Sequence, residues 1–377
     1  MTDVLIVGGG PVGLYLASLL VSHGLAVRVL EQRLSRSPFS RAIGIHPPAL
    51  EALDRIGVTS RLVAAGVQIH HGLAIGSGRP VAGMSFDGLS GRFPFVLSLP
   101  QEQTEAILEH RLRELDPAAL QRGSTVTGMH DDGRTVTLNV ASASGSSRHT
   151  SLLAIAADGV RSSMREFLGI PSRLKIYPDA YLMGDFQDST DFGSDAVLFL
   201  AAKGIVESFP LPGSLRRWVV RMPGLPRQAE PATVADLVYE RTGIPIDPET
   251  NSMLSSFGVR SRRAVRLIHG RTALIGDAAH EVSPIGGQGM NLGWLDAAAL
   301  APIIVAAIRG QPVATDLRAY ERSRLHASAK AMRQAGINMA LGRPVPPLLL
   351  AARNRVLGEV AGIPAVNAWV ARRFTMH

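Results

Sequence analysis

The chain opens on a short apolar run, a glycine cluster and a helical pattern of apolar positions. Val4–Val7 is continuously apolar, the helical spacing runs over Val12–Ser22, and a second apolar run, Ala26–Leu30, follows the break at His23-Gly24. Short apolar runs bounded by glycine are typical of buried strands. A strand, helix, strand order predicts a parallel pair joined by a right-handed crossover. This stretch therefore indicates an α/β domain.

The same texture continues and then gives way to another. Helical patterns recur at Pro48–Ile56 and Glu102–Leu115, and strand alternation is found at Ser124–Met129, Thr135–Val140 and Ser151–Ala157. From Lys175 to Phe257 short β-like segments alternate with Pro and Gly turns, which predicts an antiparallel sheet. Those segments are Asp195–Leu200, Gly204–Phe209 and Arg216–Met222, with one helical stretch at Thr233–Arg241. Gly72–Val96 has the same character.

The glycine cluster after the first run has the spacing G-x-G-x-x-G, from Gly8 to Gly13. Between a strand and a helix, the first glycine permits the tight turn, Gly10 lets a pyrophosphate approach the backbone, and Gly13 lets helix and strand pack closely. The pyrophosphate would lie at the helix N-terminus, where free N–H groups favour an anion. Glu31, at the end of the second strand, can accept hydrogen bonds from a ribose. The motif predicts a nucleotide site without distinguishing NAD from FAD.

A second motif, Arg271–Asn291, favours FAD. Thr272–Ile275 is a buried strand that ends at Gly276-Asp277, where a carboxylate could bind a polyol chain. Ser283-Pro284 then lead into Gly286–Gly289 and a helix beginning at about Met290. The positive end of such a helix would stabilise an isoalloxazine that gains negative charge on reduction.

These motifs define a discontinuous nucleotide-binding domain with an inserted sheet. The predicted class is mixed α/β and α+β: a Rossmann-like domain, an antiparallel-sheet substrate domain and C-terminal helices. The expected ranges are residues 1–72, 97–173 and 258–315 for the first, 73–96 and 174–257 for the second, and 316–377 for the helices, which break at Gly342–Pro344 and Pro346-Pro347.

Composition narrows the possible chemistry. There are no cysteines, which excludes disulfides, thiolate nucleophiles and a flavin disulfide reductase, and leaves no tether for covalent flavin. No metal site is expected. The net charge of +8 is almost all arginine; it reflects either arginine codon preference or steering of anionic nucleotides into a cleft. No basic run with interleaved aromatic residues suggests nucleic acid, and neither a signal peptide nor an integral membrane segment is expected, so we predict a cytoplasmic protein.

On these residues the chain resembles the single-component flavoprotein monooxygenases of the para-hydroxybenzoate hydroxylase type. Gly8–Gly13 with Glu31 matches the first family fingerprint, and Gly276–Asn291 matches the third. Ala157–Arg165 matches the D-G-x-x-S-x-x-R element, with Ala157 where the family commonly has Gly. Arg41 matches an arginine that contacts the cofactor, and Gln101 a glutamine near the ribityl chain. The larger members' thioredoxin-like domain has no counterpart here, which implies a compact form.

The motifs and the resemblance together assign a set of residues to cofactor binding. They are Gly8, Gly10, Pro11, Val12, Gly13, Glu31, Gln32, Arg33, Arg41, Gln101, Val126, Asp158, Gly159, Gly276, Asp277, Pro284, Gly287, Gln288, Gly289, Met290 and Asn291. Arg161 and Arg165 either belong to this site or form a solvated helix face. His280 could be mistaken for a catalytic base, but a structural role is preferred, and no catalytic residue is assigned.

The resemblance implies non-covalent FAD, NADPH or NADH as a transient electron donor, and dioxygen. A flavin C4a-hydroperoxide would hydroxylate an aromatic or polyketide-like small molecule. The substrate would lie against Lys175–Phe186, Asp195–Phe209 and Arg216–Met222, with Met183, Phe199, Phe209 and Trp218 forming an apolar wall. The alternatives are a reductase or oxidase on the same fold, and a non-catalytic flavin-binding pathway protein. A monomer and a homodimer are both compatible with the sequence.

Overall fold

A computed structural model describes residues 2–36, 41–226, 228–361 and 363–376. Its first sheet has the strand order β17-β18-β11-β1-β2-β8. The strands are β1 (Thr2–Val7), β2 (Val27–Glu31), β8 (Leu120–Arg122), β11 (Gly145–Ala156), β17 (Ile268–His269) and β18 (Thr272–Leu274), and the hairpin strands β9 (Thr125–Asp131) and β10 (Val136–Ser142) extend from β11. β1 pairs in parallel with both β2 and β11, as the crossover predicts. A tight turn joins β10, which ends at Ser142, to β11, which begins at Gly145.

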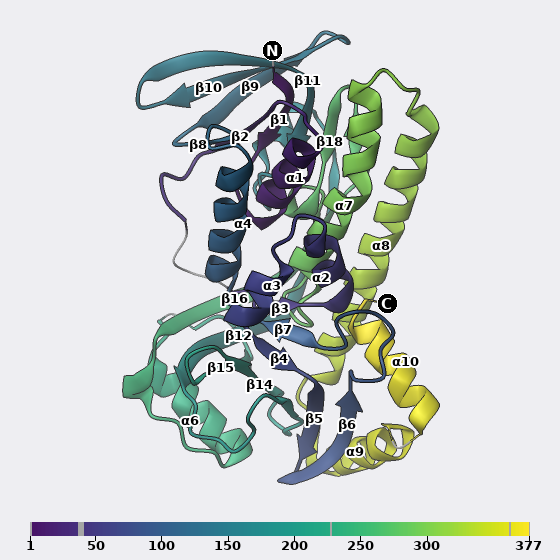
Figure 1. Ribbon diagram of the computed structural model, residues 1–377. Helices are drawn as coiled ribbons and strands as arrows, with labels where there is room; N and C mark the ends of the chain where they lie inside the picture. Colours follow the sequence, from purple (N-terminus) through teal and green to yellow (C-terminus); the bar gives the residue numbers. More distant parts are fainter. Residues whose placement is uncertain (1, 37–40, 227, 362, 377) are drawn as a thin grey trace.

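Helices cover this sheet. They are α1 (Pro11–Ser22), α4 (Gln101–Leu115) and α7 (Gln288–Ile308), with α2 (Pro47–Asp54), α3 (Thr59–Ala65) and α5 (Ser163–Phe167) around them. In Figure 1 α1 lies between α4 and α7 in the upper half of the molecule. Because α1 is apolar on nearly all sides, eight of its residues, Gly13 to Leu20, are buried. The largest core cluster forms here, between the sheet and these helices.

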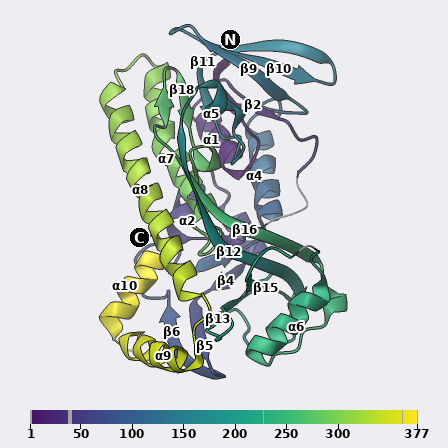
Figure 2. The same cartoon turned by 180° about the vertical axis from the view of Figure 1, so that it is seen from behind.

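The second sheet fills the lower half of Figure 1 and has the order β19-β16-β12-β15-β14-β13-β5-β6. Its strands are β5 (His71–Gly76), β6 (Arg79–Ser85), β12 (Ser172–Gln187), β13 (Ala196–Phe199), β14 (Val206–Leu211), β15 (Leu215–Met222), β16 (Met253–Ala264) and β19 (His280–Glu281). β5 joins by pairing in parallel with β13. The long strands β12 and β16 pair along their length and, in Figure 2, run from the upper to the lower half of the molecule.

Successive residues of a strand point to opposite faces of a sheet, and the two faces of the second sheet have different neighbours. Phe199, Val206 and Trp218 lie on one face and pack with Val234 and Val238 of α6 (Pro231–Thr242). The opposite face carries a separate cluster that includes Met183, Val219 and Phe257. This opposite face, called the cavity face below, lies toward the turns that follow β1, β11 and β18 of the first sheet.

The remaining elements join the two halves. A small sheet, β3-β7-β4, consists of β3 (Gly44–Ile45), β4 (Val67–Ile69) and β7 (Val96–Ser98). The helix α8 (Ala314–Leu341) runs beside α7 (Figure 2), and α9 (Pro347–Ala361) and α10 (Pro364–Phe374) pack on β6. The short helices η1 (Pro248–Thr250) and η2 (Gly276–Ala278) complete the chain.

Within the part of the chain that the structure describes, one helix, α7, is long and apolar enough to cross a membrane by length and composition. Most of its residues are buried inside the protein, where it packs against α1, α2 and α8. A core helix passes the same test, so the apolar character of α7 has a sufficient explanation in packing.

Candidate functional site

A cavity of about 1320 Å³ lies between the turns of the first sheet and the cavity face of the second. Its wall includes the β1–α1 turn, the end of β2, the start of α4, the turn after β11, the turn after β18 and the start of α7. The carboxyl ends of parallel strands share one edge of a sheet, which is where ligands of open α/β sheets bind. Three motifs far apart in the sequence therefore meet in this cavity.

The β1–α1 turn is built by its glycines, each for a different reason. Gly8 has φ +107°, and a Cβ on it would lie 2.3 Å from the carbonyl oxygen of Ala157. A Cβ on Gly13 would lie 2.0 Å from the carbonyl oxygen of Gly8. Gly10 differs, because a Cβ there would meet no protein atom within 4 Å, although Gly10 lines the cavity. The turn thus presents bare backbone to open space at Gly10.

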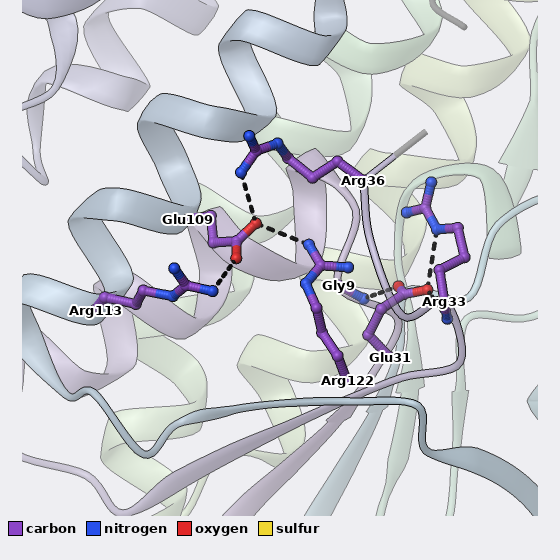
Figure 3. Close-up of polar contacts among 7 residues, drawn as sticks. All are labelled: Gly9, Glu31, Arg33, Arg36, Glu109, Arg113 and Arg122. Atoms are coloured by element: carbon purple, nitrogen blue, oxygen red, sulfur yellow. Dashed lines mark hydrogen bonds and ion pairs between the residues drawn. The ribbon is translucent and has the colours of Figure 1, made fainter. Parts of the chain in front are cut away.

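Glu31 faces the same turn from the end of β2. Its side chain is buried, Oε2 accepts a hydrogen bond from the backbone N–H of Gly9 at 2.7 Å, and Oε1 accepts from the Arg33 backbone N–H and Nε at 2.8 and 3.0 Å (Figure 3). Burial alone would raise the pKa of Glu31, but these hydrogen bonds and the Arg33 charge keep it below its ordinary value. Glu31 is therefore an ionised group, already fixed in position.

A second buried carboxylate, Glu109 of α4, lies behind this corner with three arginines around it. Arg36, Arg113 and Arg122 donate to it at 3.3, 2.6 and 2.7 Å (Figure 3). Burial would raise the pKa of Glu109, but Arg122 and the other two arginines hold it below its ordinary value. The cluster connects the segment after β2, α4 and β8. The cluster has three arginines for one glutamate and is therefore positively charged. Part of the chain's excess positive charge thus lies next to the β1–α1 turn.

Two of the predicted residues enter the cavity from other segments. Gln101 begins α4, and its Nε2 donates to Glu105 Oε1 at 2.7 Å. Arg41 precedes β3; its Nε donates to Ser255 Oγ at 3.3 Å, and its guanidinium lies 5.3 Å from the centroid of the Phe257 ring. Both line the cavity. Arg41 thus touches the cavity face of the second sheet, which brings it between the two halves.

The Asp158-Gly159 turn follows β11 and opens α5. Asp158 Oδ2 accepts from the backbone N–H of Met164 at 3.0 Å, and Gly159 has φ +77°. Arg165 is buried rather than solvated, and its guanidinium donates to the carbonyl oxygens of Ala278 at 2.9 Å and Val160 at 3.3 Å. Arg165 therefore connects this turn to the turn after β18. Arg161, by contrast, is exposed and lines the cavity.

The Gly276-Asp277 turn is supported from beneath by Asp296 of α7, which is fully buried. Asp296 Oδ2 accepts from the Gly276 backbone N–H at 3.1 Å and from His280 Nε2 at 2.6 Å, and Oδ1 accepts from Arg324 Nε at 2.6 Å. Burial would lower the pKa of His280 and raise that of Asp296, but the contact between the two groups reverses both shifts. Arg324 adds to the lowering of the pKa of Asp296 and opposes the rise at His280. His280 is buried beneath the turn and does not line the cavity, which supports the structural role expected for it.

Asp277 itself points into the cavity, where water can reach it. Enclosure by protein raises the pKa of Asp277 to about 6, with the nearby carboxylates Glu281 and Asp296 adding to the rise and His280 opposing it. Ionisation of this carboxylate therefore depends on pH in the physiological range.

The start of α7 differs in detail from the prediction. The helix begins at Gln288 after Gly287, which has φ +66° and is its N-cap. Gly287, Gly289 and Met290 line the cavity, but Gln288 and Asn291 do not. Gly289 does not have positive φ, and a Cβ on it would come no closer than 3.9 Å to protein, so only close approach of a ligand would require glycine there.

Asn291 and Gln288 make hydrogen bonds within the protein, because residues on successive positions of a helix point in different directions. Asn291 Oδ1 accepts from the His46 backbone N–H at 2.8 Å, and its Nδ2 donates to the Gly44 and Gly287 carbonyl oxygens at 2.9 and 2.7 Å. Gln288 Nε2 donates to the Phe374 carbonyl oxygen at 3.4 Å. Gly13 is likewise a packing position and does not line the cavity.

The other residues predicted to bind the cofactor all line the cavity. They are Gly8, Gly10, Pro11, Val12, Glu31, Gln32, Arg33, Arg41, Gln101, Val126, Asp158, Gly159, Gly276, Asp277, Pro284, Gly287, Gly289 and Met290.

The family follows from comparison with known proteins. A family model described as an FAD binding domain matches residues 1–335.

The chain belongs to the FAD-binding domain family.

Relatives in this FAD-binding family indicate the class of enzyme. An anhydrotetracycline monooxygenase from Streptomyces rimosus is 31% identical over 384 residues, which cover 98% of this chain and 75% of the relative. A para-nitrophenol 4-monooxygenase from Pseudomonas sp. strain WBC-3 is 30% identical over 352 residues, covering 86% and 83%. The crystal structure of p-nitrophenol 4-monooxygenase from Pseudomonas putida DLL-E4 has the same fold, with a TM-score of 0.91, 24% identity and coverage of 100% and 98%. The predicted family, fold, FAD cofactor and flavin-dependent monooxygenase class are confirmed.

The cavity wall formed by the second sheet is largely apolar. Of the four residues predicted to form this wall, two do not line the cavity. Met183 and Phe209 line the cavity. Phe199 and Trp218 stack on each other, with centroids 6.0 Å apart, on the face covered by α6. A shift of one residue along a strand reverses the face that a side chain occupies. Sequence patterns therefore found the strands without fixing which face meets the ligand.

Several buried acids were missed by the sequence analysis, and two of them, Asp296 and Glu207, bear directly on the cavity. Asp296 is the lone charged residue in the apolar helix α7, and such a residue signals a buried polar network. Glu207, on the cavity face of β14, had no comparable signal, because one acid in a short alternating strand is ordinarily solvated.

Proposed function

We propose that this protein hydroxylates a phenolic or polyketide-like aromatic molecule, using NAD(P)H and dioxygen with FAD bound between the two sheets. The observation that carries the proposal is that one continuous cavity joins all three glycine turns to the apolar cavity face. Bound FAD would supply the redox chemistry, accepting a hydride and activating dioxygen. The chain's residues would bind the cofactor, orient the substrate and exclude water.

The cavity fits FAD as follows. The bare backbone at Gly10 and the N-terminus of α1 would receive the pyrophosphate, and Glu31 the ribose. Gln101 and Asp277 border the middle of the cavity and would receive the ribityl hydroxyls. The start of α7, at Gly287 to Met290, would face the pyrimidine edge of the flavin.

The reaction is tested with the purified FAD-loaded protein. NAD(P)H oxidation is followed against a panel of phenols and polyketide intermediates, with peroxide measured in parallel and ¹⁸O-labelled dioxygen supplied. We expect at least one phenol to stimulate NAD(P)H oxidation and to gain one labelled oxygen. Reduction or dehydrogenation of a substrate without labelled oxygen would instead identify a reductase or oxidase. Flavin binding without any substrate-stimulated oxidation would identify a non-catalytic binder.

Replacing Asp277 with alanine should weaken FAD binding by about tenfold to a hundredfold, because a charge-assisted hydrogen bond contributes roughly 1.5–3 kcal/mol. The ionised carboxylate is the stronger acceptor, so binding by the parent should also weaken as pH falls through about 6, the pKa of Asp277. Asp277→Asn should lose this pH dependence. The dissociation constant of FAD, measured by flavin fluorescence against pH, checks both results. Equal affinity in folded Asp277→Ala and parent protein would contradict the assignment.

A further inference from the structure

One row of residues crosses the cavity face from strand to strand. The strand registers place Leu198 opposite Ala74 and Glu207, Val219 opposite Glu207 and Met183, and Met183 opposite Ser255. All six residues line the cavity. Glu207 is therefore the one carboxylate in a row that is otherwise apolar except for a serine at its far end.

Glu207 is buried, with 8% of its surface exposed, in the middle of the apolar cluster that includes Met183, Val219 and Phe257. Among the residues that the structure describes, no hydrogen bond or ion pair reaches its carboxylate. Burial raises the pKa of Glu207 to about 7. A buried carboxylate without a partner is unfavourable, so a ligand that supplies the missing hydrogen bond would gain from it.

The charged groups around Glu207 already have partners. On the neighbouring strand β15, Arg217 donates to both oxygens of Asp185 and Arg221 donates to Asp179. Arg41 contacts Ser255 and the Phe257 ring. Across the cavity, Glu281 pairs with Arg260. Among the described residues Asp277 has no such pair, but it lies at the turn after β18, where the proposed function assigns it to the ribityl hydroxyls of FAD.

A neutral polar group, the Tyr181 hydroxyl, also lies near Glu207. The Tyr181 hydroxyl, on β12, is buried without a hydrogen-bond partner among the described residues. Burial, and after it the charge of Glu207, raises the pKa of Tyr181 well above its ordinary value. Tyr181 stays protonated at neutral pH, so Glu207 is the group on this face that can gain or lose a proton there.

We propose that Glu207 accepts the hydrogen bond, and then the proton, of a phenolic hydroxyl on the substrate. The inference rests on the proposed function and names the group that the substrate must present. In the step, the phenol O–H bond breaks, its electron pair stays on the phenol oxygen, and the proton passes to the Glu207 carboxylate. The ring becomes more electron-rich as a phenolate, which favours attack on an electrophilic oxygen. After turnover the proton returns to solvent.

The arrangement also defines the substrate class. The substrate would direct a neutral, hydrogen-donating hydroxyl at β14, with an apolar ring system against Leu198, Val219 and Met183. A carboxylate or sulfonate at that position would be repelled by ionised Glu207. The structure therefore favours an uncharged phenol over an aromatic acid bound through its acid group.

Binding can be measured without turnover, on the FAD-loaded protein in the absence of NAD(P)H. The two probes are 1-naphthol, which stays neutral through this pH range, and 1-methoxynaphthalene, which has the same rings and no O–H. Because a hydrogen bond to a carboxylate is stronger than one to a carboxylic acid, affinity for 1-naphthol should rise by about tenfold as pH rises from about 6 to about 8. Affinity for 1-methoxynaphthalene should stay level or fall, because it displaces water from the carboxylate.

Three variants complete the test. Glu207→Gln keeps the shape of the side chain but cannot ionise, so its affinity for 1-naphthol should not vary over this range. Glu207→Asp should retain the rise, and so should Glu281→Gln, which removes a cavity carboxylate that already has a partner. For a phenol that the parent oxygenates, turnover by Glu207→Gln should fall by about a hundredfold or more, the usual contribution of a proton-accepting group.

Each outcome decides the proposal. It is overturned if neither probe binds, if 1-naphthol affinity in the parent does not depend on pH, or if Glu207→Gln keeps that dependence. The proposed function is tested separately by labelled oxygen in the product. A parent that oxygenates phenols while Glu207→Gln behaves like it would remove the role of Glu207 alone. A parent that binds 1-naphthol through Glu207 without oxygenating any phenol would remove the proposed function alone.

Discussion

Replacing Gly13 with alanine should destabilise the protein by more than about 3 kcal/mol and greatly reduce FAD binding. The new Cβ would lie 2.0 Å from the Gly8 carbonyl oxygen and 3.2 Å from its carbonyl carbon. Both are backbone atoms of the turn, so neither can rotate away, and relief requires α1 to move off β1. Overpacking of a core usually costs about 1–3 kcal/mol, and a clash with backbone, which no side-chain rotation can relieve, should exceed that range. Urea unfolding of the apoprotein measures the loss.

Gly10→Ala is the matched control in the same turn. Its Cβ would meet no protein atom within 4 Å, so the unfolding free energy of the apoprotein should change by less than about 1 kcal/mol. FAD binding should nevertheless weaken, because the methyl group would occupy the space proposed for the pyrophosphate. The two variants thus separate packing of the turn from access of the ligand. Parent-like unfolding of Gly13→Ala would show that the turn is looser than its geometry indicates.

Replacing Asp296 with alanine should cost about 3–5 kcal/mol, the usual effect of removing one partner from a buried ion pair. The Gly276 N–H, His280 and Arg324 would all lose their common acceptor. Because the Gly276 turn carries Asp277, FAD should also dissociate more readily. Glu240→Ala, which breaks an exposed pair with Lys203, should change stability by no more than about 1 kcal/mol. Thermal or urea unfolding of both variants checks the contrast.

The pH dependence of stability gives an independent measurement on the same network. The pKa of Asp296 is lowered in the folded protein, so its contribution is present at neutral pH and is lost as pH falls through that lowered pKa. The pKa of His280 is raised, so its contribution is present below the ordinary histidine pKa and is lost as pH rises through the folded value. Asp296→Asn should flatten both dependences. If stability depends on pH in the same way in Asp296→Asn and in the parent, this network is not the source of that dependence.

Local signals in the sequence were sufficient to predict the two glycine turns that line one side of the cavity. The Gly8–Gly13 turn and the Gly276-Asp277 turn are each encoded by neighbouring residues, so their geometry could be predicted without knowing the rest of the fold. Arg165 was ambiguous, because its partner Ala278 lies far away in the sequence and only the folded chain shows that it is buried.

The cavity wall formed by the second sheet was harder to predict from the sequence, for a physical reason. Strands alternate with a period of two, and both faces of the second sheet are apolar, one under α6 and one against the cavity. The pattern therefore could not distinguish Phe209, which lines the cavity, from Phe199, which does not. The same ambiguity concealed Glu207, whose partnerless position becomes visible only once the strand registers are known.

The long strand β16 has a consequence for how such enzymes diverge. At one end Met253, Ser255 and Phe257 line the cavity, while at the other end Arg262 and Arg263 pair with Glu281 and His280 beside the cofactor turn. Side chains at alternate positions of the first end can change without altering the backbone ladder that supports the second. Point replacements at the cavity end of β16 can therefore change which substrates are accepted while the strand pairing that holds the turn after β18 stays the same.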